Sequence, residues 1–115
     1  MTIVTQPLQE PTFLILTALA GSPMHGYGVI QEVAALSGGR VKLRPGTLYG
    51  ALDRLSDQGL VEVRHEEVVD GRLRRYYELT NDGTKLLEAE VARLAHNAQA
   101  ARARLKTRFS TGQAT

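Results

Sequence analysis

The stretch RPGTLYGALDRLSDQGLV, residues 44–61, decides the fold, because it predicts one amphipathic helix with a clear beginning and end. Its apolar residues recur at i, i+3, i+4 and i+7, which places them on one buried face: Leu48, Ala51, Leu52 and Leu55. Pro45 suits the first turn of a helix, and Gly59 suits the left-handed position that ends one. Leu60 then brings the chain back onto Leu55. The remaining faces of the helix are free to contact another molecule.

Two further helices are predicted before this stretch and a hairpin after it. Residues 10–20 form a helix that is apolar on more than one face, and it is therefore either deeply buried or shared with a partner. A second helix lies within 25–39 and ends at Gly38. After residue 60 the apolar period changes from 3.6 to 2, and Asp-Gly at 70–71 is a strong hairpin signal. This order predicts a mainly α fold with a two-stranded β wing (α+β), a winged helix-turn-helix.

A long last helix is predicted to join two copies of the chain. Thr80 can cap it, and it extends over about 81–108, which is too long to be covered by its own domain. Its apolar residues alternate four and three positions apart, as in a coiled-coil seam: Leu87, Val91, Leu94, Ala98, Ala101 and Leu105. The predicted organisation is a flexible arm over 1–9, a winged domain over 10–80, a dimerisation helix over 81–108 and a disordered tail over 109–115.

Composition argues against several functions. The 115 residues suffice for one domain, and the absence of cysteine rules out disulfides and thiol chemistry. The N-terminus has no secretory pattern, and the longest apolar run, FLILTALAG, is too short to span a bilayer, so we expect a cytoplasmic protein without membrane contact. His25, His65 and His96 lack the spacing of metal ligands, and neither a phosphate loop nor a nucleophile motif occurs. We therefore expect no metal, no cofactor and no enzymatic activity.

Positive charge is concentrated where the hairpin turns. No Lys or Arg precedes Arg40, although the net charge of the chain is +2. Three guanidiniums follow the Asp-Gly turn within four residues: Arg72, Arg74 and Arg75. On an extended strand Arg72 and Arg74 share one face and Arg75 lies opposite. Such a tip can clamp a phosphate backbone or enter a minor groove, whereas the alternative is a solvated charged ribbon that protects a sheet edge.

The helix at 45–57 occupies the place of a DNA-recognition helix. In helix-turn-helix proteins the later helix enters the major groove. Thr47 and Tyr49 can donate to phosphates, and Arg54 can reach a phosphate or a guanine edge. The alternative is a plain amphipathic helix. At the start of the preceding helix, His25 either makes a helix-end hydrogen bond or contacts DNA, and Tyr27 either contacts DNA or lies in the core.

Three segments resemble the PadR family of bacterial transcriptional regulators: PTFLILTALAGSPMHGYGVIQEV at 11–33, PGTLYGALDRLSDQGLVE at 45–62 and DGRLRRYYELTNDG at 70–83. The resemblance implies a dimeric winged-helix protein, usually a repressor, that binds a DNA operator and whose single C-terminal helix packs across the dimer. It implies DNA contacts by Tyr27, Thr47, Tyr49, Arg72, Arg74 and Arg75. Three basic residues at positions where members of the family vary complete the candidate set: Lys42, Arg44 and Arg54.

Two other interpretations stay open at this stage. A winged-helix domain can serve protein–protein assembly without DNA, but such modules usually lack an arginine-rich wing tip. PadR-like dimers can also hold a small-molecule effector between the C-terminal helices and the core, which is compatible with DNA binding. The chain has no Trp and few aromatic residues, so the sequence does not support a stacked aromatic cage. The amino-acid sequence does not identify the operator, the regulated gene or an effector.

Overall fold

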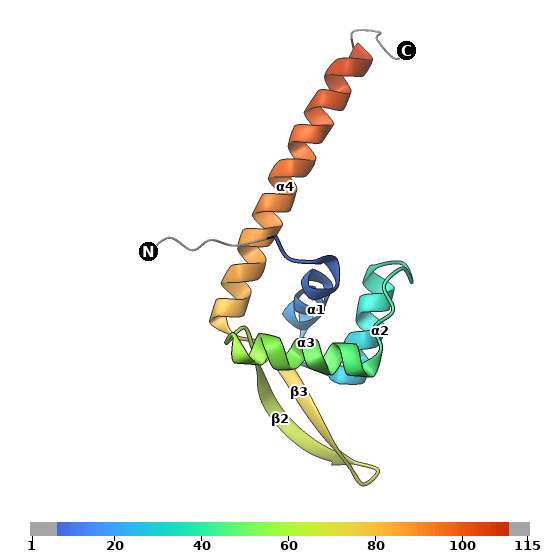
Figure 1. Ribbon diagram of the computed structural model, residues 1–115, viewed down its shortest axis with the longest axis vertical. Coiled ribbons are helices and arrows are strands. Elements are labelled where there is room, and N and C mark those ends of the chain that lie inside the picture. Colours follow the sequence, from blue (N-terminus) through green and yellow to red (C-terminus); the bar gives the residue numbers. More distant parts are fainter. Residues whose placement is uncertain (1–6, 111–115) are drawn as a thin grey trace.

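The computed structural model describes residues 7–110 and contains four α-helices and one small antiparallel sheet among them. In chain order the elements are α1 (Glu10–Gly21), β1 (Met24–His25), α2 (Gly26–Leu36), α3 (Pro45–Asp57), β2 (Val61–Val69), β3 (Arg72–Leu79) and α4 (Asn81–Ser110). The α1–α3 helices lie together, the β2–β3 wing extends from them, and α4 projects away from the wing tip (Figure 1). The predicted winged helix-turn-helix fold is confirmed.

The core forms where the three short helices meet the base of the sheet. Each helix contributes side chains that are almost fully buried, and the sheet adds one residue from each long strand. The central members are Ile15 and Leu16 of α1, Val29 and Val33 of α2, Leu48 and Leu52 of α3, Val61 of β2 and Tyr77 of β3. The predicted stripe on α3 is buried in full. This packing fixes the outward face of α3 relative to the wing.

The turn signals in the sequence are realised as predicted. At the end of α3 the Leu60 N–H donates to the Leu55 carbonyl at 2.9 Å and Gly59 N–H to the Ser56 carbonyl at 2.9 Å, with Gly59 at φ 74°. These are the two hydrogen bonds of a Schellman motif. In the wing turn, Asp70 and Gly71 have φ of 52° and 75°, as a type I′ hairpin requires.

The sheet has three strands, one more than the sequence predicted. The short strand β1 pairs antiparallel with β3, with Met24 opposite Tyr77 and His25 opposite Tyr76, so the order is β1-β3-β2. Two residues are too few to show a period of 2, and their partners lie some fifty positions further along the chain. The strand pins the beginning of α2 to the base of the wing.

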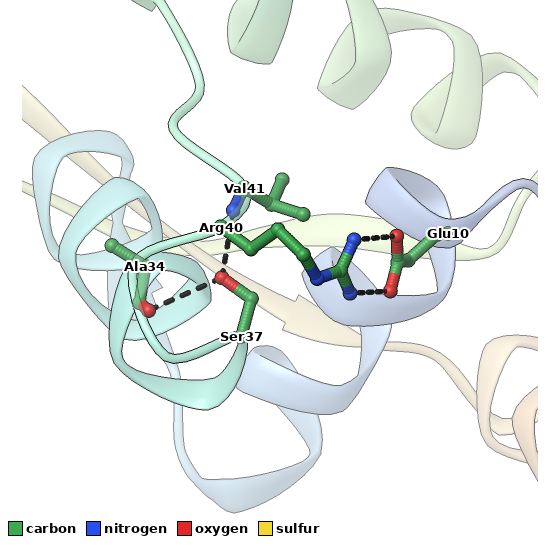
Figure 2. Close-up of polar contacts among 5 residues, drawn as sticks. All are labelled: Glu10, Ala34, Ser37, Arg40 and Val41. Atoms are coloured by element: carbon green, nitrogen blue, oxygen red, sulfur yellow. Dashed lines mark hydrogen bonds and ion pairs between the residues drawn. The ribbon is translucent and has the colours of Figure 1, made fainter.

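The connection from α2 to α3 is anchored at its base (Figure 2). Ser37 Oγ donates to the Ala34 carbonyl at 3.2 Å and accepts from the Val41 N–H at 2.9 Å. Arg40 forms a two-pronged ion pair with Glu10 of α1, one contact being 2.8 Å between Nη1 and Oε1. This ion pair lowers the pKa of the Glu10 carboxyl. Lys42 and Arg44 therefore extend from a loop whose first half is held.

The start of the long helix α4 is held by Thr80 against Gly59 and Leu60, the residues that follow the C-cap of α3. Thr80 N–H donates to the Leu60 carbonyl at 3.1 Å, Thr80 Oγ1 donates to the Gly59 carbonyl at 2.6 Å, and Gly83 N–H donates to Thr80 Oγ1 at 3.0 Å. Thr80 is thus the predicted cap. The helix reaches Ser110, beyond the predicted end at 108, so residues 109–110 are helical rather than part of a tail.

The structure describes only part of the predicted N-terminal arm and of the predicted C-terminal tail. Residues 1–6 of the predicted arm and 111–115 of the predicted tail lie outside the described residues. The arm was predicted to be flexible, but its last residues are held, because the Leu8 N–H donates to Glu90 Oε2 of α4 at 2.9 Å. Glu90 is buried and also accepts from Arg93 Nε and Nη2, which lowers the pKa of its carboxyl.

Candidate nucleic-acid interface

A polar groove lies between α3, the start of α2 and the wing. It has a volume of about 820 Å³, and five of the nine predicted DNA-contacting residues line it: Tyr27, Tyr49, Arg72, Arg74 and Arg75. The others are exposed outside it, and they are Lys42, Arg44, Thr47 and Arg54. The groove therefore joins two predicted elements, the recognition helix and the wing.

Tyr27 and Tyr49 present their rings at this groove. Tyr27 is 63% exposed and Tyr49 is 45% exposed, although both belong to helices that pack on the core. The possibility that Tyr27 is a core residue is excluded, because Val29 and Val33 form the buried face of α2 instead. A large phenol left open beside a basic ribbon is available to an external partner.

The wing arginines differ in how far they are already engaged. Arg75 Nε donates to Glu66 Oε2 at 2.7 Å, and this contact raises the pKa of the guanidinium. Neither Arg72 nor Arg74 forms an ion pair with an acid among residues 7–110. Within the described chain these two are the wing-tip cations open to a phosphate, whereas Arg75 must exchange Glu66 for it.

His25 makes the helix-end hydrogen bond that the sequence suggested. Its Nδ1 accepts from the Gly28 N–H at 3.1 Å, as an N-cap side chain does. Its ring meets the edge of Tyr76 with centroids 5.3 Å apart, and Tyr76 stacks on His65 at 4.4 Å. Burial and the nearby Arg74 lower the pKa of His25, with Glu67 acting in the opposite direction. His25 thus ties α2 to the wing in its neutral form.

Several groove residues were not among the nine predicted contacts, although a DNA contact by His25 was left open as an alternative. They are His25, Gly26, Asp53, Val69, Asp70, Leu73 and Tyr77. Asp53 adds negative charge near Tyr77, and burial is the main cause of the raised pKa of the Tyr77 hydroxyl. Gly26 and Tyr49 meet across α2 and α3, and no local sequence pattern could indicate that contact.

The seam residues on α4 are largely uncovered within one chain. Leu87 packs partly on the core, but Val91, Leu94 and Leu105 are exposed by 50%, 40% and 55%. Ala98 and Ala101 are exposed as well. Phe109 adds a further exposed apolar side chain near the end of the helix. The chain thus offers an apolar stripe that it does not itself bury.

No helix within 7–110 has both the length and the apolar character needed to cross a membrane. The same residues contain no group of three His, Asp or Glu side chains placed to hold a metal ion.

The three helices and the β2–β3 wing define a winged helix-turn-helix protein. Residues 15–89 match the Transcriptional regulator PadR-like family, and this is more than half of the chain. The chain belongs to that family, whose members are transcriptional regulators and not enzymes.

Two relatives and one solved structure illustrate the similarity. An uncharacterized 37.1 kDa protein in transposon TN4556 of Streptomyces fradiae is 44% identical over 86 residues, which cover 75% of this chain but only 23% of that protein. Transcriptional regulator Rv3488 of Mycobacterium tuberculosis (strain ATCC 25618 / H37Rv) is 42% identical over 73 residues, 64% of each chain. This chain thus spans less than two thirds of the length of either relative.

The fold also matches the crystal structure of Bacillus subtilis PadR in complex with operator DNA. The TM-score is 0.64 at 20% identity, and the match covers 72% of this chain and 48% of that one. At this identity the likeness concerns the fold.

Proposed function

We propose that this protein is a sequence-specific DNA-binding regulator that acts as a repressor, and that its groove between α3 and the wing holds one half of an operator. The observation that carries the proposal is the groove itself, where two exposed phenols face two wing arginines that have no acidic partner among residues 7–110. Arginine and tyrosine are typical donors to phosphate oxygens. The operator-bound Bacillus subtilis PadR, which has the same fold, supports duplex DNA as the partner.

Within this proposal the nine predicted residues divide by position. On α3, Thr47 and Tyr49 donate to phosphates, and Arg54 reaches a phosphate or a guanine edge in the major groove. Arg72, Arg74 and Arg75 extend from the wing toward the backbone, with Tyr27 on the same groove. Lys42 and Arg44 precede α3 on the anchored loop and add phosphate contacts. Phosphate contacts set orientation, and base contacts set sequence preference.

We infer that the chain acts as a homodimer on a palindromic site. The exposed stripe on α4, from Leu87 to Leu105, has coiled-coil spacing and lies on a helix of about 45 Å that extends beyond its own domain. A two-fold dimer presents two α3 helices to half-sites about one helical turn, or a multiple of it, apart. As a DNA-binding regulator it would act in the cytoplasm.

A small-molecule effector is a compatible extension of the proposal. An open groove of about 590 Å³ lies between the end of α1, β3 and α4, and its lining includes Leu19, Leu79, Leu87 and Val91. Because Leu87 and Val91 also belong to the α4 stripe, a ligand there would touch the dimer contact. Binding at this place would change the spacing of the two α3 helices and release the operator.

Selection of bound duplexes from a random pool tests the proposal. The expected result is enrichment of a two-fold symmetric site whose affinity falls steeply with salt, as phosphate contacts require. Enrichment of no sequence, or no duplex binding at low salt, would contradict DNA recognition. It would favour the alternative use of the fold in protein–protein assembly.

A further inference from the structure

We propose that Gly26 is a positioning residue for DNA binding: its lack of a side chain lets the phenol of Tyr49 lie against the first turn of α2, which sets the place of the Tyr49 hydroxyl in the groove. The inference rests on the proposed DNA-binding function and adds a residue that makes no DNA contact of its own.

The contact between the two residues is unusually close. A Cβ atom built on Gly26 would lie 2.3 Å from Tyr49 Oη, 2.6 Å from Cζ and 3.0 Å from Cε1. Even alanine is therefore incompatible with the observed position of the ring. The first turn of α2 and the recognition helix α3 thus touch through one glycine and one phenol.

The backbone of Gly26 gives no other reason for glycine at this position. The glycines with positive φ among residues 7–110 are Gly38, Gly39, Gly59 and Gly71, and Gly26 is not one of them. Gly26 is also the first residue of an α-helix, so its backbone is helical and needs no glycine. The ring of Tyr49 is the neighbour that a side chain at position 26 would meet.

The ring can yield without unfolding the domain. Tyr49 is 45% exposed, and the atoms that a Cβ would meet lie at the far end of its side chain rather than on the backbone. Rotation about its side-chain bonds would move the phenol off Gly26 and change its place in the groove shared with Arg74 and Tyr77. A substitution at Gly26 should therefore spare the fold and disturb the DNA-facing surface.

The test compares Gly26→Ala with Gly28→Ala in the full-length chain, using the duplex selected from the random pool. A Cβ at Gly28 would make only ordinary contacts, 3.6 Å or more from His25, so this variant is a matched control in the same helix turn. We expect Gly26→Ala to bind about tenfold more weakly or worse, which is the loss for one hydrogen bond to a charged group. Gly28→Ala should bind as the wild type does, and both variants should unfold at or above the wild-type temperature.

A double-mutant cycle with Tyr49→Ala separates positioning from a general defect. Once the phenol is absent, Gly26→Ala should cost no further affinity, because its effect is transmitted through that ring. An equal loss in the presence and absence of Tyr49 would overturn the proposal, as would wild-type affinity in Gly26→Ala itself.

Fluorotyrosine NMR supplies a readout that needs no DNA. The resonance that disappears in Tyr49→Phe should shift in Gly26→Ala and stay in place in Gly28→Ala. An unshifted resonance in Gly26→Ala would overturn the contact. A shifted resonance in Gly26→Ala, together with a wild-type chain that binds no duplex, would leave the contact standing and refute DNA binding itself.

Discussion

The groove at α3 and the outer part of α4 are the two large surfaces that the domain leaves open, and they are open in different ways. The groove is polar, and its walls are fixed by the His25 cap, the β1 strand and the core beneath α3. The outer part of α4 is apolar and has little of its own chain against it, with Leu94, Leu105 and Phe109 all exposed.

This difference separates a surface whose shape one chain fixes by itself from one that, under the proposed function, a second copy covers. Water forms hydrogen bonds with exposed polar groups until a ligand replaces it. An open polar groove therefore does not destabilise the single chain. Exposed apolar side chains at seam spacing gain free energy when a partner covers them. Substitutions in the two regions should therefore fail in different ways.

The largest effect is expected from Leu94→Asp on α4. A carboxylate in the seam would be buried without a partner, which costs several kcal/mol, and the dimer should dissociate. Operator affinity should then fall by about 10²–10⁴-fold, because the second half-site no longer binds intramolecularly. Sedimentation and DNA titration measure both effects.

His96→Asp is the matched control, since His96 lies on the opposite side of the same helix and is exposed. It should remain dimeric and bind normally. A tight, well-folded Leu94→Asp dimer would place the dimer contact elsewhere, with the apolar helix α1 as the next candidate.

A smaller effect is expected from removing Arg72 and Arg74 together. Both should neutralise phosphates, so the double alanine variant should bind all duplexes more weakly and lose about one unit of salt slope per lost contact. Arg64→Ala removes a charge from the same ribbon, but Arg64 is paired with Glu78 at 3.1 Å and lies away from the groove. A slope that is equally changed in both variants would indicate a general charge effect rather than contacts at the tip.

Gly83→Ala tests the contact between the start of α4 and Leu60, which follows α3. A Cβ on Gly83 would lie 2.0 Å from the Leu60 carbonyl oxygen. The start of α4 must therefore move away from Leu60 in this variant. Overpacking of this kind costs roughly 1–3 kcal/mol in unfolding free energy. Gly21→Ala, which meets nothing within 4 Å, is the control in denaturant titrations. Equal unfolding free energies for the two variants would show that α4 is not tightly packed against Leu60.

The smallest expected effect is the pH dependence that His25 contributes. Its pKa in the folded protein lies below the ordinary 6.5, so the unfolded chain binds the proton more readily. Stability should therefore fall as pH drops below about 6.5 and level off below the folded pKa. His25→Asn keeps a capping side chain without the titration, and its unfolding free energy should change less over this interval. An identical pH profile for both proteins would show that His25 does not cause the dependence.

The sequence predicted features whose causes are local. The α3 stripe, the Gly59 motif, the Asp70-Gly71 turn and the Thr80 cap each depend on a few neighbouring residues with defined backbone requirements. The order of these elements was then sufficient to predict the winged helix-turn-helix fold. The residue assignments to DNA contact and to the α4 seam stay predictions.

Features that depend on distant pairs could not be predicted. Strand β1 exists because Met24 and His25 meet Tyr77 and Tyr76, and two residues show no period. The Arg40–Glu10 ion pair and the Leu8–Glu90 hydrogen bond join residues 30 and 82 positions apart. The contact between Gly26 and Tyr49 is of the same kind. In each case, the partner is chosen by tertiary packing rather than by the surrounding sequence.

Titration of the wild-type chain with two versions of its selected duplex tests the central claim most directly, since it engages both surfaces together. One version keeps both half-sites, and the other has one half-site scrambled. We predict two chains on the intact duplex and a loss of at least about 100-fold in affinity when one half-site is scrambled, because the tethered second groove loses its target. Equal affinity for the two duplexes, with one chain bound to each, would contradict the claim that α4 joins two copies of the chain so that both grooves bind one duplex.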